Sequence, residues 1–139
     1  MPGWTIRTAT PEDIDAVLAL WRADDVQPVT GSDRAGLQRL LARDAEALLI
    51  AELSGALVGS LIAVWDGWRG SFYRLAVHPE HRRQGLAGAL VREGERRLAG
   101  HDAERLAAIV ACEDPGAHEF WTAAGYECQS ERERFVREL

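Results

Sequence analysis

The chain has 139 residues, of which 47% are hydrophobic, and this is enough apolar material to bury one core. Its formal net charge of −6 excludes nucleic acid as the main partner, because binding to a phosphate backbone needs a basic face. No apolar run reaches the roughly 18 residues of a membrane span, and the N-terminus lacks a charged-then-apolar signal, so we expect a cytoplasmic protein without a membrane partner.

The N-terminal half shows the patterns of a strand, two helices and a hairpin. Thr10-Pro11-Glu12-Asp13 is a strong helix start, with a hydroxyl N-cap, a proline in the first position and acids in the first turn. Apolar residues at helical spacing follow it and recur at Leu37, Leu40 and Leu41. In order, we expect a strand at 4–7, a helix from 11, a loop over 24–32, a second helix ending near 44, and strands at 47–53 and 56–65 joined by a Ser54-Gly55 turn.

The C-terminal half alternates strands with helices. Pro115 and Gly125 occupy the positions expected at the beginning and just past the end of a helix. In order, we expect a turn at 66–70, a strand at 71–78, a helix at 86–99, a strand at 105–111, a helix at 115–124, and one or two strands within 126–138. Together the elements predict a single α/β domain over 1–139, without repeats or linkers.

The turn that precedes the helix at 86–99 has the chemistry of a phosphate-binding site. Gly85 can adopt positive φ and, with Gly88, leaves room for a ligand at the backbone. The helix begins with free N–H groups and the positive end of its dipole, and Arg82 and Arg83 add donors for phosphate. The lysine-containing loop of nucleoside triphosphatases and the dinucleotide pattern G-x-G-x-x-G are both absent. The turn therefore predicts a pyrophosphate site, and an ordinary strand–turn–helix connection with solvated arginines is the alternative.

The run Arg82-x-x-Gly85-x-Ala87 resembles the acetyl-coenzyme A signature of the GNAT (GCN5-related N-acetyltransferase) superfamily, [RQ]-x-x-G-x-[GA]. The preceding Leu75-Ala76-Val77-His78-Pro79-Glu80 is similar to the family's fourth strand and its exit, and the stretch from Asp66 resembles a small bacterial branch (YpeA-like). The resemblance implies a GNAT fold, with one mixed, mostly antiparallel sheet of six to seven strands, flanked by four helices and splayed between strands 4 and 5.

A second match begins at Asp114 and ends at Tyr126, and it resembles the family pattern N-x-x-A-x-x-[FL]-Y-x-x-x-G-[FY]. In that arrangement Phe120 and Trp121 lie next to the coenzyme tail. Two positions depart from the pattern. Asp114 replaces the usual asparagine and has no amide donor, and Trp121 replaces the tyrosine that protonates the leaving thiolate in many relatives.

The resemblance also implies how acetyl-CoA is held and attacked. The open edge of the fourth strand pairs with the pantetheine arm, and the Val77 N–H polarises the thioester carbonyl. A base must accept the proton of the acceptor amine, and Glu113 and Asp114 at the end of the fifth strand are the candidates; solvation or capping is their alternative role. The expected coenzyme-binding residues are Leu75, Ala76, Val77, Arg82, Arg83, Gln84, Gly85, Leu86, Ala87, Gly88, Phe120 and Trp121.

Other residues with reactive side chains are weaker candidates. His78 offers a base, but strand-end packing explains it as well, and Tyr73 or Tyr126 can replace the missing acid. Cys112 has no recognisable histidine partner for a covalent intermediate. Two cysteines and four scattered histidines predict no metal site and no disulfide framework.

The acceptor is expected to be a primary amine, on a small molecule or a peptide. The segment 12–46, which walls the acceptor side in the family, contains eight acids against four arginines, a net charge of −4 that suits a cationic amine. A solvated acidic surface explains this count too. Two function classes stay open: an N-acetyltransferase that uses acetyl-CoA, and a catalytically weak acyl-CoA-binding or sensing module. Whether the chain forms a homodimer is also open.

Overall fold

A computed structural model describes residues 3–24, 28–111 and 114–139. Its backbone divides into two compact units, Met1–Ala108 and Ile109–Leu139, and each is described by itself. The first unit contains the sheet and the predicted phosphate-binding turn, and the second contains the last helix and the C-terminal segment. That the whole chain forms a single domain over 1–139 stays a prediction.

The sheet of the first unit has its strands side by side in chain order. They are β1 (Trp4–Thr8), β2 (Leu48–Leu53), β3 (Ala56–Trp65), β4 (Gly70–Val77) and β5 (Leu106–Ala108). The first four strands are antiparallel, and β5 runs parallel to β4. This confirms the predicted mixed, mostly antiparallel sheet. The strand predicted at 105–111 is shorter than expected.

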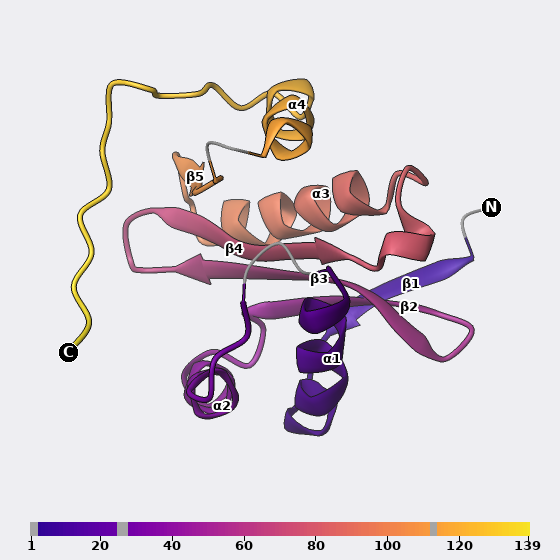
Figure 1. The fold of residues 1–139 in the computed structure, drawn as a ribbon. Helices are drawn as coiled ribbons and strands as arrows, with labels where there is room; N and C mark the ends of the chain where they lie inside the picture. Colours follow the sequence, from indigo (N-terminus) through magenta and orange to yellow (C-terminus); the bar gives the residue numbers. More distant parts are fainter. Residues whose placement is uncertain (1–2, 25–27, 112–113) are drawn as a thin grey trace. The chain divides into compact units, whose positions relative to one another are not determined.

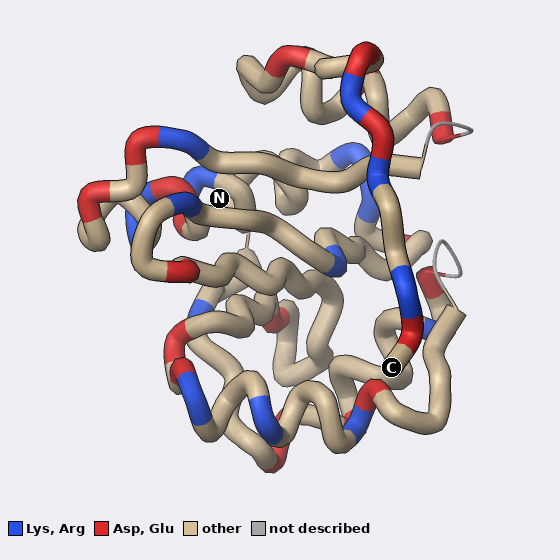
Figure 2. The backbone as a smooth tube through the Cα atoms, turned by 90° about the vertical axis from the view of Figure 1, so that its left-hand side faces the viewer, with Lys and Arg blue, Asp and Glu red and all other residues tan. Residues whose placement is uncertain are grey.

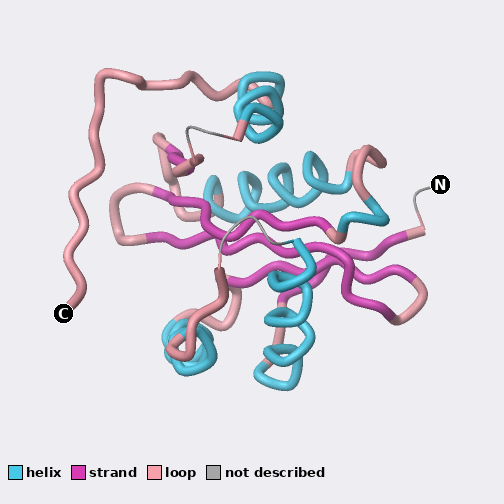
Figure 3. The backbone as a smooth tube through the Cα atoms, in the orientation of Figure 1, coloured by secondary structure: helices cyan, strands magenta, loops and turns pink. Residues whose placement is uncertain are grey.

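Helices cover both faces of this sheet (Figures 1 and 3). A 3-10 turn, η1 (Pro11–Asp13), leads into α1 (Ile14–Asp24), and α1 lies with α2 (Asp33–Arg43) on one face. A second 3-10 turn, η2 (Pro79–His81), precedes α3 (Leu86–Ala99), which covers the opposite face. None of the described helices combines the length and the apolar composition that crossing a membrane requires.

Alternation along the strands gives each face of the sheet its own apolar contacts. On the α1 side, buried side chains of both helices pack on Leu48, Ile50, Ile62 and Ala76. On the α3 side, Gly94 lets the helix approach closely. A Cβ built there would lie 2.7 Å from the Phe72 ring and 3.1 Å from Leu61, which is closer than real contacts allow.

Arg97 anchors the C-terminal half of α3 to the neighbouring elements. Its guanidinium donates to the Ala63 carbonyl at 2.7 Å and to both carboxylate oxygens of Asp44 at 2.7 and 2.6 Å. The side chain is 10% exposed, and its buried Nε has no acceptor among the residues that the structure describes. This pair joins α3, β3 and the connection between α2 and β2.

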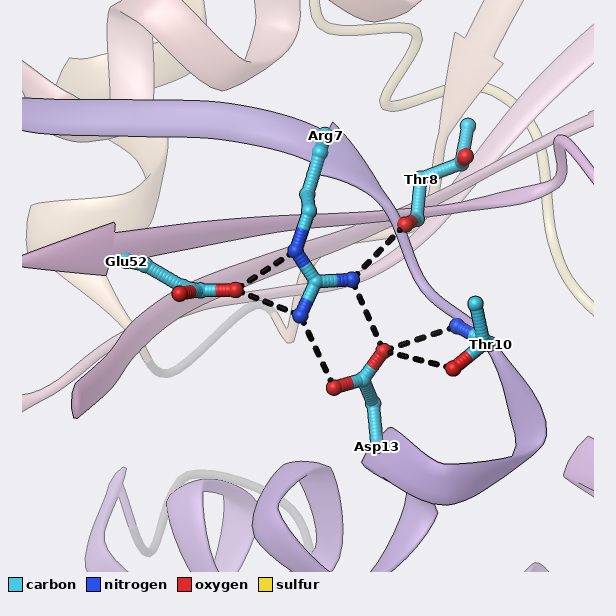
Figure 4. Close-up of polar contacts among 5 residues, drawn as sticks. All are labelled: Arg7, Thr8, Thr10, Asp13 and Glu52. Atoms are coloured by element: carbon cyan, nitrogen blue, oxygen red, sulfur yellow. Dashed lines mark hydrogen bonds and ion pairs between the residues drawn. The ribbon is translucent and has the colours of Figure 1, made fainter. Parts of the chain in front are cut away.

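A network around Arg7 fixes the start of η1 (Figure 4). Arg7 donates to Glu52 on β2 and, through two N–H groups, to Asp13 at 2.9 Å each. Asp13 also accepts the Thr10 backbone N–H at 2.8 Å, as expected for the predicted helix start. The hydrogen bonds from Arg7 are the main cause that lowers the pKa of Asp13 to about 2.

The second unit contains α4 (Pro115–Ala123), close to its predicted bounds. Within the described part of 126–138 there is no strand, so the sheet has five strands and not the six to seven predicted (Figure 3). Acids and arginines alternate along this segment, as Figure 2 shows, and its large apolar side chains Phe135 and Val136 are 90% and 71% exposed. A segment with so few apolar residues has little to bury against a sheet.

Candidate active site

The edge of β4 that faces away from β3 is open along the second half of the strand. The ladder between β4 and β5 covers only Gly70–Phe72, so no described strand pairs with this edge from Tyr73 to Val77. The His78 N–H donates to the Val58 carbonyl on β3 at 2.8 Å. Because backbone groups alternate along a strand, the N–H and carbonyl of Val77 face the open edge. This is the predicted splay between strands 4 and 5.

A bulge in β4 lies within this open stretch. Ser60 pairs with Ala76 and Ile62 with Tyr73, so two residues of β4, Arg74 and Leu75, lie opposite one residue of β3. Arg74 has φ +53, a left-handed conformation that is rare for a side chain other than glycine. Such a residue costs about 1–3 kcal/mol and persists only where its surroundings hold it.

The predicted phosphate-binding turn has the backbone that its glycine suggested. Gly85 has φ +82 and is the N-cap of α3, and Arg83 also has positive φ. A Cβ built on Gly85 would meet no described atom within 4 Å. The first helical bond of α3 runs from the Ala89 N–H to the Gly85 carbonyl, at 3.1 Å. The N–H groups of 86–88 therefore have no acceptor inside the helix, which is the arrangement that binds an anion.

Arg82 holds this turn against the end of β4 and against α1. Its Nε donates to the Val77 carbonyl at 3.3 Å, and Nη2 lies 2.5 Å from a carboxylate oxygen of Asp24. The side chain is still 47% exposed. Arg83 and Gln84 are exposed, so Arg83 carries a positive charge at the mouth of the turn.

His78 has a structural role at the exit of β4. Its Nδ1 accepts the Glu80 N–H at 3.2 Å, which caps η2. One ligand atom each of His78, Glu80 and His81 lie within 4.8 Å of one another. The hydrogen bond from Glu80 uses Nδ1 of His78, so this ring nitrogen has a structural partner in η2. Capping agrees with the strand-end role that the sequence suggested.

The remaining predicted site residues belong to the second unit or lie outside the described residues. Cys112 and Glu113 are not described. Asp114 is the N-cap of α4, and its Oδ1 accepts the Ala117 N–H at 3.0 Å. Phe120 and Trp121 meet edge to face with ring centroids 5.2 Å apart, and Trp121 meets Tyr126 in the same way at 5.0 Å.

Arginines from outside the segment 12–46 balance its negative charge. The net charge of −4 counts only residues within that segment and therefore leaves them out. Four of its acids form ion pairs with arginines from other parts of the first unit. The pairs are Asp13 with Arg7, Asp24 with Arg82, Asp33 with Arg74, and Asp44 with Arg97. Four added positive charges cancel the net charge of −4. In Figure 2 the two signs are interspersed along the chain. The charge count therefore gives no support for a cationic acceptor.

Sequence reasoning missed the group of residues around the bulge. The helical spacing of the apolar residues after Asp13, Trp21 among them, indicates only an apolar helix face, and no motif includes Ser60 or Arg74. A signal was present, because Ser60 interrupts an apolar strand and Arg74 lies inside another. Which residues they meet depends on the pairing of distant elements.

Comparisons with known proteins agree on one family. The family model described as "Acetyltransferase (GNAT) family" matches residues 14–126. An acetyltransferase of Yersinia enterocolitica is 34% identical over 124 residues, which are 89% of this chain and 88% of that protein. Among solved structures, Ard1 from Thermoplasma volcanium has a TM-score of 0.82 at 19% identity, covering 92% of this chain and 85% of that one. AAC(6')-Iy, in complex with the bisubstrate analogue CoA-S-monomethyl-acetylneamine, has a TM-score of 0.76 at 19% identity and 98% coverage of both chains.

Proposed function

The chain belongs to the acetyltransferase (GNAT) family and is an acyltransferase, and on this premise we propose that it moves the acetyl group of acetyl-CoA to a primary amine of a small molecule or peptide. The observation that carries this proposal is the open edge of β4, which leads through η2 and the turn at 82–85 to a helix start with unpaired N–H groups. Acetyl-CoA has a thioester at one end of its pantetheine arm and a pyrophosphate at the other. Binding it therefore needs a strand edge for the arm and, beyond it, a site for the pyrophosphate.

Each part of the donor has a counterpart in the first unit. The N–H groups at the start of α3 and the side chain of Arg83 face where a pyrophosphate would bind. The outward backbone groups of Leu75–Val77 can pair with an extended amide chain as a further strand would, except the Val77 carbonyl, which already accepts from Arg82. The outward N–H of Val77 is then the donor that polarises the thioester carbonyl. Leu86 is buried, and Ala87 and Gly88 add little or no side-chain bulk at the same turn.

The reaction is a direct attack of the amine on the thioester carbon. A nitrogen–carbon bond forms, the carbon–sulfur bond breaks, and the thiolate leaves with a proton. Holding the two reactants together can supply roughly 7–11 kcal/mol of the barrier. A cationic amine with a pKa near 10 must first lose its proton to a base or a water chain, for which Glu113 and Asp114 remain the proposed groups.

The leaving thiolate has no tyrosine to protonate it at position 121. An ordinary thiol has a pKa of about 8.5, so solvent or the proton released by the amine can serve near neutral pH. The indole of Trp121 packs between Phe120 and Tyr126, and we assign it with Phe120 to contact with the coenzyme.

The amine acceptor is supported by the family and by the acetylneamine part of the analogue bound to AAC(6')-Iy. The balanced charges of the segment 12–46 do not choose between a small amine and a peptide. We also propose a cytoplasmic location, on the sequence grounds given above.

The replacement of tyrosine by Trp121 favours one competing function, a module that binds acyl-CoA without efficient transfer. Thiol release from acetyl-CoA in the presence of a panel of small amines and peptides separates the two. An enzyme releases thiol only when a suitable amine is added. If acetyl-CoA binds but no amine in the panel causes thiol release, the result supports the competing function, a module that only binds acyl-CoA.

A further inference from the structure

The bulge in β4 is held by groups that play no part in the proposed chemistry. The indole N–H of Trp21 donates to the Ser60 hydroxyl at 2.9 Å, and that hydroxyl donates to the Arg74 carbonyl at 3.0 Å. Ser60 is fully buried. Relaxing the backbone of Arg74 away from φ +53 would therefore leave a buried hydroxyl without its acceptor, a loss of about 1–3 kcal/mol.

The side chain of Arg74 reaches from the same bulge to three other parts of the unit. Its guanidinium carbon lies 4.4 Å from the centroid of the Trp21 ring on α1, an arrangement favourable for a cation over an aromatic face. Nη2 donates to the Pro28 carbonyl at 3.0 Å and to the Asp33 carboxylate at 3.3 Å. The side chain is only 18% exposed.

These contacts join the strained residue to both helices on that face. Trp21 is in α1, Asp33 is the first residue of α2, and Pro28 begins 28–32, the described part of the chain between them, which is called the connection here. The residues that follow Arg74, Leu75–Val77, form the rest of the open stretch of β4. A shift of the connection therefore pulls on the side chain of Arg74, and a shift of the bulge moves its backbone and the start of the open edge.

We propose that Arg74 is a positioning residue that couples the connection between α1 and α2 to the open edge of β4. This inference rests on the proposed function, in which the acyl group lies on that edge, and on the expectation from the family resemblance that the acceptor lies against the segment 12–46. A coupling free energy acts in both directions. Acetyl-CoA bound at the edge should reduce opening motions of the connection. The position of the connection should in turn affect the affinity for the acceptor.

Arg74→Gly separates this role from backbone strain. Glycine accepts positive φ, so the bulge loses its strain while the side chain and its contacts disappear. Arg74→Lys keeps the charge beside Asp33 but loses the flat guanidinium over Trp21. Ser54→Gly is the matched control, because Ser54 has φ +51 in the hairpin between β2 and β3, away from the bulge.

Hydrogen exchange of the amides at 29–36, with and without acetyl-CoA, measures the coupling directly. We expect acetyl-CoA to slow exchange there in the natural protein and in Ser54→Gly. In Arg74→Gly acetyl-CoA should bind within about twofold of its normal affinity without slowing that exchange, and Arg74→Lys should lie between. With an amine that the natural protein acetylates, Arg74→Gly should raise the KM for that amine by about fivefold or more.

The outcomes separate this inference from the function it rests on. Equal slowing of exchange in Arg74→Gly and the natural protein, or no slowing in either, would overturn the coupling while leaving the acetyltransferase proposal intact. A natural protein that does not bind acetyl-CoA in calorimetry would overturn the proposed function, and the coupling with it. If acetyl-CoA binds but no amine in the panel is acetylated, the exchange measurement alone decides.

Discussion

Gly85→Val is the sharpest test of the phosphate-binding turn, and Gly55→Val is its matched control. Both glycines have φ +82, and a Cβ on either would meet no described atom within 4 Å. Valine therefore meets the same left-handed backbone at both positions, without a clash inside the protein. We expect each variant to lose about 1–3 kcal/mol of unfolding free energy, and the two losses to be similar.

The two variants should differ in their affinity for acetyl-CoA. Gly85 immediately precedes the N–H groups that begin α3, whereas Gly55 lies in the hairpin between β2 and β3. A β-branched side chain at Gly85 occupies the space that a pyrophosphate needs and turns those N–H groups away. We expect at least about tenfold weaker binding, or 1.4 kcal/mol, for Gly85→Val and normal binding for Gly55→Val.

Urea unfolding and calorimetric titration with acetyl-CoA check both expectations on the same samples. Normal affinity in a folded Gly85→Val protein would refute the assignment of the turn. An equal loss of affinity in Gly55→Val would show that general destabilisation, and not the blocked turn, weakens binding.

Three further predictions concern proton transfer and stability. Glu113→Gln should lower kcat/KM by at least about tenfold, roughly 1.4 kcal/mol, with acetyl-CoA binding little changed. Normal steady-state kinetics of this variant would place the base elsewhere. Asp114→Asn keeps a good N-cap and should turn over normally. Trp121→Phe should change acetyl-CoA affinity through lost packing and leave the pH profile of kcat alone, so a moved alkaline limb would tie the indole to proton transfer. The pKa of Asp13 falls from 3.8 to about 2 in the fold, chiefly through its hydrogen bonds from Arg7, so its carboxylate stabilises the protein above about pH 4 and loses this effect as the pH falls through 2. Asp13→Asn should therefore lower the unfolding free energy by about 1–2 kcal/mol near pH 7, because Arg7 is partly screened by solvent, and the gap should close in acid; a gap that is constant with pH would contradict the ion pair.

Elements specified by neighbouring residues were predictable from the sequence. Thr10-Pro11 marks the start of η1, Ser54-Gly55 forms the hairpin turn, and Gly85 takes the positive φ that its turn needs. In each case the signal lies within a few residues of the element it specifies. The resemblance to a family then led to the proposal that the turn at 82–88, which follows the open edge of β4, binds the coenzyme.

What escaped prediction depends on distant residues. The bulge at Arg74 arises where β3 and β4 pair, and the charge of the segment 12–46 is balanced by arginines from other elements. The expected strands within 126–138 followed the family's element order more than this chain's residues. Alternating Glu131-Arg132-Glu133-Arg134 supplies charges where a buried strand needs apolar side chains.

The partly buried pair of Arg97 and Asp44, whose side chains are 10% and 30% exposed, makes the stability of the α3 face depend on temperature. Removing two charged groups from water is costly at room temperature, and here one guanidinium N–H gains no acceptor in return. Hydration of charged groups becomes less favourable on warming, so this cost shrinks while the attraction between the two groups remains. The pair therefore contributes least in the cold and most near the melting point. An apolar pair that replaces them and raises the free energy of unfolding at 25 °C would therefore lose that advantage near the melting temperature.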